Sequence, residues 1–247
     1  MQQDKNQCQA TVFGDFSVIQ PNAETVRYFM ESFSDLKMIP SVLETPETRQ
    51  TRAITFRIGP DIRFLFRSDD SRWTVSFQNE RIDVLATKLA PDHPDLPGSE
   101  AFRDQALTLF KAVVDRFPIK FSRLSYVAKH FLLNATPEEL RSVFTSRFGA
   151  TTFYTDYPPR HWSLRVNSRK ATIFTSDEEL NVITQMGTRS VETRIDSEVS
   201  TLDGVDCTFD IKTAEELTEA RFTLTDNAGF LSEAAALEAD LRAQMLS

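Results

Sequence analysis

Two segments of this chain share one pattern, and that pattern constrains the fold more than any other sequence feature. The chain has only two tryptophans, and across Arg72–Val84 and His161–Ile173 the residues around them match in kind. In both segments apolar residues alternate with polar ones after the tryptophan, which is typical of strands with one buried face. The match predicts one hairpin design used twice, with Trp73 and Trp162 as core anchors at equivalent places.

The rest of the chain cycles twice through strand, helix, antiparallel strands and helix. In the first cycle we expect strands and helices over residues 10–19, 21–36, 52–58, 62–67, 73–77, 82–84 and 100–117, with a loop around Pro40 and Pro46. In the second cycle we expect them over residues 124–131, 136–149, 162–166, 171–174, 180–186, 193–199, 206–211 and 227–245. Each helix shows apolar residues at helical spacing, and each strand shows alternation.

Two helix starts carry capping signals. Asn22 precedes the first helix as a candidate N-cap, because its side-chain oxygen can accept a backbone N–H of the first turn. Thr136, Pro137 and Glu139 form a capping-box signature with proline at the first helical position. These signals predict two helices at equivalent places, each following the first strand of its cycle.

The predicted fold is therefore α+β. Two similar strand–helix–antiparallel meander–helix halves form a large curved antiparallel sheet, with the long helices packed on one face. Residues 1–9 are polar and predicted to be frayed, residues 10–120 form the first half and residues 121–247 the second. The two halves are expected to make one integrated domain.

Composition narrows the class of protein. The chain carries 20 phenylalanines against 4 tyrosines, which favours core filling because Phe has no polar group to satisfy. The net charge of −8 opposes binding to a phosphate backbone. Two cysteines imply no disulfide framework, and no leader or apolar run of membrane length is seen, so we expect a soluble cytoplasmic protein without a membrane partner.

The order of elements resembles the duplicated fold of the TATA-box-binding protein and the helix-grip folds, as an analogy of architecture alone. The TATA-box-binding protein grips DNA with its concave sheet. Here the arginines of the first meander alternate with acids, which favours an ion-pair lattice over a nucleic-acid surface. The residues concerned are Arg57, Arg63, Arg67, Arg72 and Arg81, beside Asp61, Asp69, Asp70, Glu80 and Asp83.

Phe121–Val127 and Val205–Ile211, with the helix that ends the chain, resemble a sporadically distributed prokaryotic family of uncharacterised two-module α+β proteins. The family pattern has an Asp-Phe-Asp strand, whereas here Cys207 and Thr208 separate the first aspartate from Phe209. The family also places a histidine in the final helix region, and this chain has none after His161. The patchy distribution implies an accessory role, such as a bacterial antiviral defence or mobile-element system.

The sequence lacks the common catalytic signatures. His93, His130 and His161 have no second histidine or cysteine at metal-ligand spacing, so we predict no metal site. There is no Gly-x-Ser-x-Gly elbow, and the 7 glycines form no phosphate-binding loop, so no cofactor is predicted. These absences favour a non-catalytic role over an enzymatic one.

Two clusters remain as candidate sites. The acids Asp203, Asp206 and Asp210, and the pair Glu192 and Asp196, lie on predicted strands, and residues 206 and 210 share one face; exposed acids on an edge strand explain the same spacing. The second cluster surrounds a Pro-Pro pair and is rich in aromatic and basic groups, which suits a binding hot spot. Its alternative interpretation is a turn whose tryptophan packs inward. The predicted binding residues are Tyr154, Tyr157, Arg160 and His161.

Together these observations predict a non-catalytic protein-interaction component that binds a protein partner or forms a homo-oligomer. Two alternatives stay open: a helix-grip-like protein that binds a small molecule, and a protein that binds nucleic acid through its sheet face.

Overall fold

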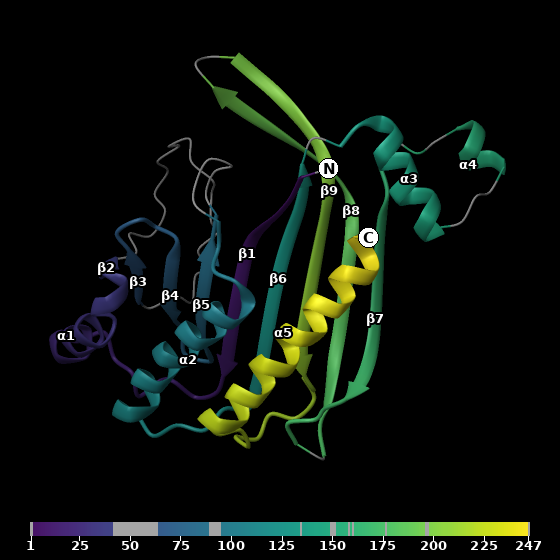
Figure 1. The fold of residues 1–247 in the computed structure, drawn as a ribbon. Coiled ribbons are helices and arrows are strands. Elements are labelled where there is room, and N and C mark those ends of the chain that lie inside the picture. The colour runs from purple at the N-terminus through teal and green to yellow at the C-terminus, as the bar shows by residue number, and fades with distance from the viewer. Residues whose placement is uncertain are drawn as a thin grey trace.

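The described strands pair into one antiparallel sheet. The computed structural model describes residues 2–41, 64–88, 95–133, 135–148, 152–157, 159, 161–175, 177–195 and 198–246. Within these residues nine strands follow the spatial order β2-β3-β4-β5-β1-β6-β9-β8-β7 (Figure 1). The strands are β1 Gln2–Phe13, β2 Met38–Ser41, β3 Phe64–Ser68, β4 Trp73–Phe77, β5 Arg81–Thr87, β6 Arg123–Leu133, β7 Ser163–Ala171, β8 Glu179–Ile195 and β9 Glu198–Thr213. The predicted α+β class with a large antiparallel sheet is confirmed.

Strand β1 lies in the middle of the sheet, where it pairs with β5 on one side and β6 on the other. The expectation that residues 1–9 fray is therefore wrong. Cys8, Ala10 and Val12 alternate onto the covered face and are almost completely buried. The polar residues before them are held by backbone pairing with β6, a long-range interaction that local polarity does not reveal.

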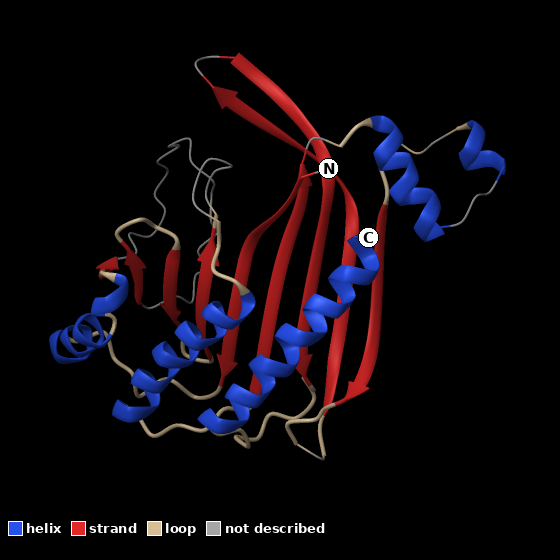
Figure 2. Cartoon of the chain, viewed as in Figure 1, coloured by secondary structure: helices blue, strands red, loops and turns tan. Residues whose placement is uncertain are grey.

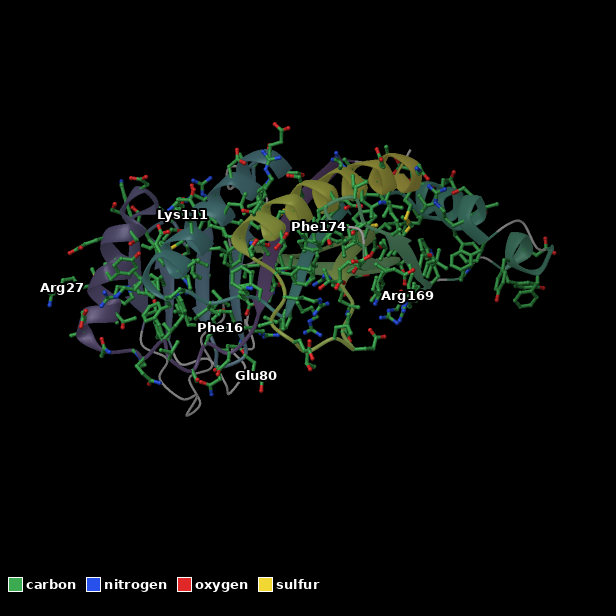
Figure 3. All side chains as sticks on the ribbon, turned by 90° about the horizontal axis from the view of Figure 1, so that it is seen from below. Phe16, Arg27, Glu80, Lys111, Arg169 and Phe174 are labelled. Atoms are coloured by element: carbon green, nitrogen blue, oxygen red, sulfur yellow. The ribbon has the colours of Figure 1, made fainter. Side chains whose placement is uncertain are left out.

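Helices cover one face of the sheet, as expected. The helices are α1 Ala23–Ser32, α2 Ser99–Arg116, α3 Pro137–Phe148, α4 Thr152–Asp156 and α5 Leu224–Leu246. α2 and α5 lie on the same side of the sheet (Figure 3) and cross it next to each other (Figure 2). α1 joins this layer through Tyr28, whose hydroxyl donates to the carbonyl of Ala112 of α2. α3 and α4 lie beyond the end of the sheet where β7 begins. No described helix has the length and apolar character needed to cross a membrane.

Phenylalanines fill the space between the helices and the sheet. Phe29 of α1 is fully buried, and its ring lies 4.8 Å from the ring of Phe77 and 5.3 Å from that of Phe33. On α2, Phe102 stacks on Trp73 with 5.6 Å between the ring centroids. The over-use of phenylalanine is thus explained mainly by the core, as predicted.

The capping signals act as predicted. Asn22 accepts the backbone N–H of Thr25. Thr136 and Glu139 form the reciprocal capping box, with hydrogen bonds of 2.8 and 3.2 Å. The last helix begins at Leu224, earlier than expected, because Thr223 and Asp226 form an equivalent box with aspartate in place of glutamate.

Some predicted strands differ from the observed ones. The segments 171–174 and 193–199 were expected to be separate strands, but the first is the end of β7 with its loop and the second lies at the tip of the long β8–β9 hairpin. β2 replaces the loop expected around Pro40. The strand expected at 52–58 lies outside the described residues.

The two tryptophans occupy different environments, so the structure does not confirm the duplication. Trp73 begins β4 and is buried under α2, whereas Trp162 precedes β7 and is only half-buried, with its ring against those of Phe144 and Phe148 of α3. The predicted match aligns both β4 and β5 with the single strand β7, so the second copy has no hairpin turn where the first has one. β7 also lacks the buried face that the alternation predicts, because it lies at the border of the sheet and its residues are exposed or half-buried.

Candidate functional site

A groove of about 400 Å³ lies between α3 and the stem of the β8–β9 hairpin. One wall comes from the exposed side of α3 and the other from the hairpin, and the segment that leads into β7 closes one end. The lining residues are Pro137, Leu140, Arg141, Phe144, Pro159, His161, Thr188, Arg189, Ser190, Asp203 and Gly204. The groove therefore combines an apolar floor with basic and hydroxyl groups at its margins.

Local contacts fix the groove's walls. The Thr136–Glu139 box sets the start of α3. Trp162 exchanges two hydrogen bonds of 3.1 Å with Thr188, one from its backbone N–H and one to its backbone carbonyl, which tie the segment before β7 to β8. At Gly204 a Cβ atom would lie 2.2 Å from the carbonyl oxygen of Leu132, so only glycine allows β9 to approach β6 this closely.

The groove is locally basic in an acidic protein. Arg141 contributes a guanidinium group and His161 an imidazole. Arg189 belongs to the lining, but its side chain alternates with those of Thr188 and Ser190 and points to the other face of the hairpin, beside Phe131. The carboxylate of Asp203 accepts a 2.6 Å hydrogen bond from Ser190 across the hairpin. Arg189 also lies over the ring of Phe131, 5.9 Å from its centroid, which restricts the arginine's position. The groove thus carries basic side chains in a chain whose net charge is −8.

Exposed aromatic side chains continue the surface beyond the groove. We call Phe148, Phe153, Tyr154 and Tyr157 the aromatic cluster; Phe153 and Tyr157 are 65% and 67% exposed. The four rings are held by ring contacts: Phe148 stacks on Phe144, Tyr154 meets Phe144 edge-on at 5.4 Å, and Phe153 contacts both tyrosines. Phe144 thus belongs both to the groove floor and to the support of the cluster.

The structure brings together three of the four predicted binding residues. His161 lines the groove, and Tyr154 and Tyr157 belong to the aromatic cluster. Arg160 lies outside the described residues. The alternative of a turn with an inward tryptophan is partly realised, since Trp162 packs against two rings of α3. Sequence reasoning missed Arg141 and Arg189, because α3 and the hairpin meet only in three dimensions.

The acidic candidates do not converge. Asp203 lies on the hairpin with Ser190, whereas Asp206 and Asp210 alternate with the buried Cys207 and Phe209 and so face the uncovered side of the sheet. Burial raises the pKa of Asp206 and of Asp210, although nearby Arg189 and Lys212 oppose the shift. In the described part of the chain no group of three or more His, Cys, Asp or Glu residues is placed to hold a metal.

A second polar cluster lies beneath α5 and is buried. Glu238 and His130 are each 1% exposed, and the Nε2 of His130 lies 2.7 Å from Oε1 of Glu238. Ser99 donates to Oε2 at 3.3 Å, and Lys5 Nζ lies 3.7 Å from the same oxygen. Burial opposes ionisation of Glu238, but the hydrogen bond from His130 and the charges of Lys5, His130 and Arg242 outweigh it and lower its pKa. This cluster joins β1, β6, α2 and α5 and serves the fold.

Both cysteines lie close to this buried cluster. Cys8 Sγ is 3.9 Å from the hydroxyl of Tyr126, and burial raises the pKa of Cys8 and of Tyr126. Burial, with the charge of Asp206, raises the pKa of Cys207 to about 12. Neither thiol is suited to act as a nucleophile, because the reactive thiolate is scarce and enclosed.

No protein-family model matches this chain, and no curated protein matches it either. The fold and the groove therefore define the class of protein only as an α+β protein built on one large antiparallel sheet.

Proposed function

We propose that this protein is a non-catalytic interaction component whose groove binds a segment of a partner protein. One observation supports the proposal above others: the aromatic cluster is exposed and continuous with the basic groove through Phe144. Clustered exposed aromatics mark interaction surfaces, because they bury a large area at small cost in conformational entropy.

The chemistry of the groove indicates the chemistry of the bound segment. Leu140, Phe144 and Pro137 offer apolar contact, while Arg141 offers charge-assisted hydrogen bonds to a carboxylate and His161 adds a further donor. We expect a segment with one or two acidic residues next to an apolar or aromatic one. Two alternatives stay predictions: a helix-grip-like protein that binds a small molecule, and a protein that binds nucleic acid. The role in a bacterial defence or mobile-element system and the cytoplasmic location also stay predictions.

The helices at the two ends of the sheet differ in how much of their surface is buried, and this difference supports a binding site beside α3. We infer a duplication in which β3–β5 with α2 correspond to β7–β9 with α5, because each set runs inward toward the central strand pair and ends in a helix on the covered face. In this correspondence α1 is equivalent to α3. Phe29 anchors α1 in the main core, whereas Phe144 is the one buried residue among those described on α3. α3 therefore keeps more of its surface for a partner.

The test is selection from a displayed peptide library, followed by fluorescence polarisation with the selected peptides. We expect enrichment of acidic residues beside apolar ones, and at least about tenfold weaker binding to the Arg141→Glu variant, since reversing a charge leaves a carboxylate facing a carboxylate. Lys111→Glu on α2, on the helix side of the sheet (Figure 3), is the charge-matched control and should bind normally. Peptides without acidic residues, or equal binding by the two variants, would refute the proposal.

A further inference from the structure

Strand β7 leaves one whole side of its backbone without a strand neighbour in the described part of the chain. It lies at the border of the sheet in Figures 1 and 2, and its only described strand partner is β8. At the other border β2 is four residues long and carries Pro40, and both features make that edge less suited to pairing with a further strand. β7 has nine residues, no proline and no glycine, so it is the edge suited to strand addition.

The hydrogen-bond register shows which residues face outward. The backbone N–H of Thr188 donates to the carbonyl of Trp162, and the N–H of Thr172 donates to the carbonyl of Glu178. These two bonds lie just before and just after β7, and the register between them has no break. In an antiparallel pair alternate residues bond to the neighbour, so the even-numbered residues of β7 bond to β8. The outward backbone groups belong to Ser163, Arg165, Asn167, Arg169 and Ala171.

Two basic residues of β7 already pair with acidic residues of the same chain, so they give no reason to expect an acidic strand from another protein. Arg169 already pairs with Glu216 at 2.9 Å, and Lys170 pairs with Glu233 of α5. Apolar exposure is the feature that lacks an explanation: Val166, at the middle of the strand, is 45% exposed, and Ile173, just after its end, is 84% exposed. These side chains indicate that the neighbouring strand also has an apolar residue at its centre.

We propose that β7 pairs antiparallel with β7 of a second copy of this chain, with the two-fold axis at Val166. In this register Val166 faces itself as a non-hydrogen-bonded pair, and Arg165 lies opposite Asn167 of the second copy. Ser163 lies opposite Arg169 of the second copy, so no like charges are directly opposed. The four outward pairs exchange about eight hydrogen bonds, and the two sheets become one.

Other registers are less favourable. An axis at Asn167 places Arg165 opposite Arg169 of the second copy at both ends, and an axis at either arginine opposes it to itself, which is destabilising. An axis at Ser168 avoids that repulsion but places Val166 opposite Lys170. The axis at Val166 covers the exposed valine with an apolar partner and directly opposes no like charges, and it also brings Ile173 toward Pro159 of the second copy. The dimer is independent of the proposed function, since it needs no foreign partner.

Light scattering after size exclusion gives the first readout, with a dimer at twice the 28.1 kDa chain mass. The Asn167→Pro variant removes an outward N–H and leaves the ladder to β8 intact, so we expect normal circular dichroism and a dimer that dissociates about tenfold more readily or worse. A monomeric wild type, or a folded Asn167→Pro variant that dimerises as well as the wild type, would overturn the proposal.

Cross-linking tests the register and does not depend on how the proline variant folds. Under oxidised glutathione, Val166→Cys should form a disulfide dimer, because cross-strand Cβ atoms on the axis lie within disulfide reach. Ser168→Cys is the matched control two residues along and should cross-link far less. The native Cys8 and Cys207 are buried and should not interfere. A stronger cross-link from Ser168→Cys than from Val166→Cys would overturn the proposed register.

Discussion

The buried Glu238–His130 pair offers the sharpest test of how the helices are held on the sheet. In Glu238→Ala the Nε2 of His130 loses its 2.7 Å partner, and Lys5, with a side chain only 17% exposed, loses its counter-charge. Removing one member of a buried ion pair costs about 3 to 5 kcal/mol, because the remaining groups stay desolvated. With a urea slope of about 3 kcal/mol per molar, the unfolding midpoint should fall by about 1 M or more.

Matched variants separate the pair from general loss of packing. Glu238→Gln keeps an acceptor for His130 and should cost about 1 to 2 kcal/mol, since a neutral hydrogen bond replaces a charge-assisted one. In the double variant with His130→Ala, the loss should be smaller than the sum of the single losses by about 1 to 3 kcal/mol. Urea unfolding followed by circular dichroism measures all of these. A loss below about 1 kcal/mol for Glu238→Ala would refute the reasoning.

The same pair predicts a pH dependence with a definite sign. The pKa of Glu238 in the folded protein lies below its ordinary value of 4.5, so the unfolded chain takes up the proton first as the pH falls. The contribution of Glu238 to stability is therefore complete above about pH 4.5 and is lost as the pH falls through the folded-state pKa. The free energy of unfolding of the wild type should approach that of Glu238→Gln as the pH falls from about 4.5 through the folded-state pKa. A constant difference between the two across this window would contradict the assignment.

Three further predictions concern other parts of the chain. Gly204→Ala should lower the free energy of unfolding by about 1 to 3 kcal/mol in urea titrations, because its Cβ meets a backbone oxygen at 2.2 Å; an unchanged midpoint would contradict the close approach of β9 to β6. Trp73→Ala should cost about 3 to 5 kcal/mol and Trp162→Ala clearly less, whereas equal losses would restore the tryptophans as equivalent core anchors. Cys8 and Cys207 should resist a disulfide reagent at pH 8 until urea unfolds the protein, because burial raises the pKa of both thiols. For Cys207, with a pKa of about 12, roughly one part in ten thousand is thiolate at pH 8. Fast labelling of the native protein would show that one of the two thiols is accessible.

Features set by neighbouring residues could be read from the sequence. The capping box at Thr136 and Glu139, the N-cap at Asn22 and the helical spacing on α2 depend on contacts within one turn, and each was predicted close to its observed position. The class of fold also followed, because alternation marks strands wherever they pair.

Features set by distant pairing could not be read in the same way. β1 was predicted to fray because Gln2–Gln9 is polar, yet two neighbouring strands hold it. The aromatic part of the candidate site was found from composition near Tyr154 and Tyr157. Its basic part was not, because Arg141 of α3 meets the β8–β9 hairpin only in three dimensions.

The central position of β1 has a consequence for how the chain is made. Gln2–Phe13 leaves the ribosome before either of its neighbours exists, since β5 begins at Arg81 and β6 at Arg123. A strand that waits with unpaired backbone groups is a template for aggregation, and hydrophilic residues reduce that hazard during synthesis. The polar sequence that makes this segment look unstructured thus suits it to remain in solution until it can be enclosed. Once enclosed between β5 and β6, its amide protons should be among the slowest in the protein to exchange with deuterated water.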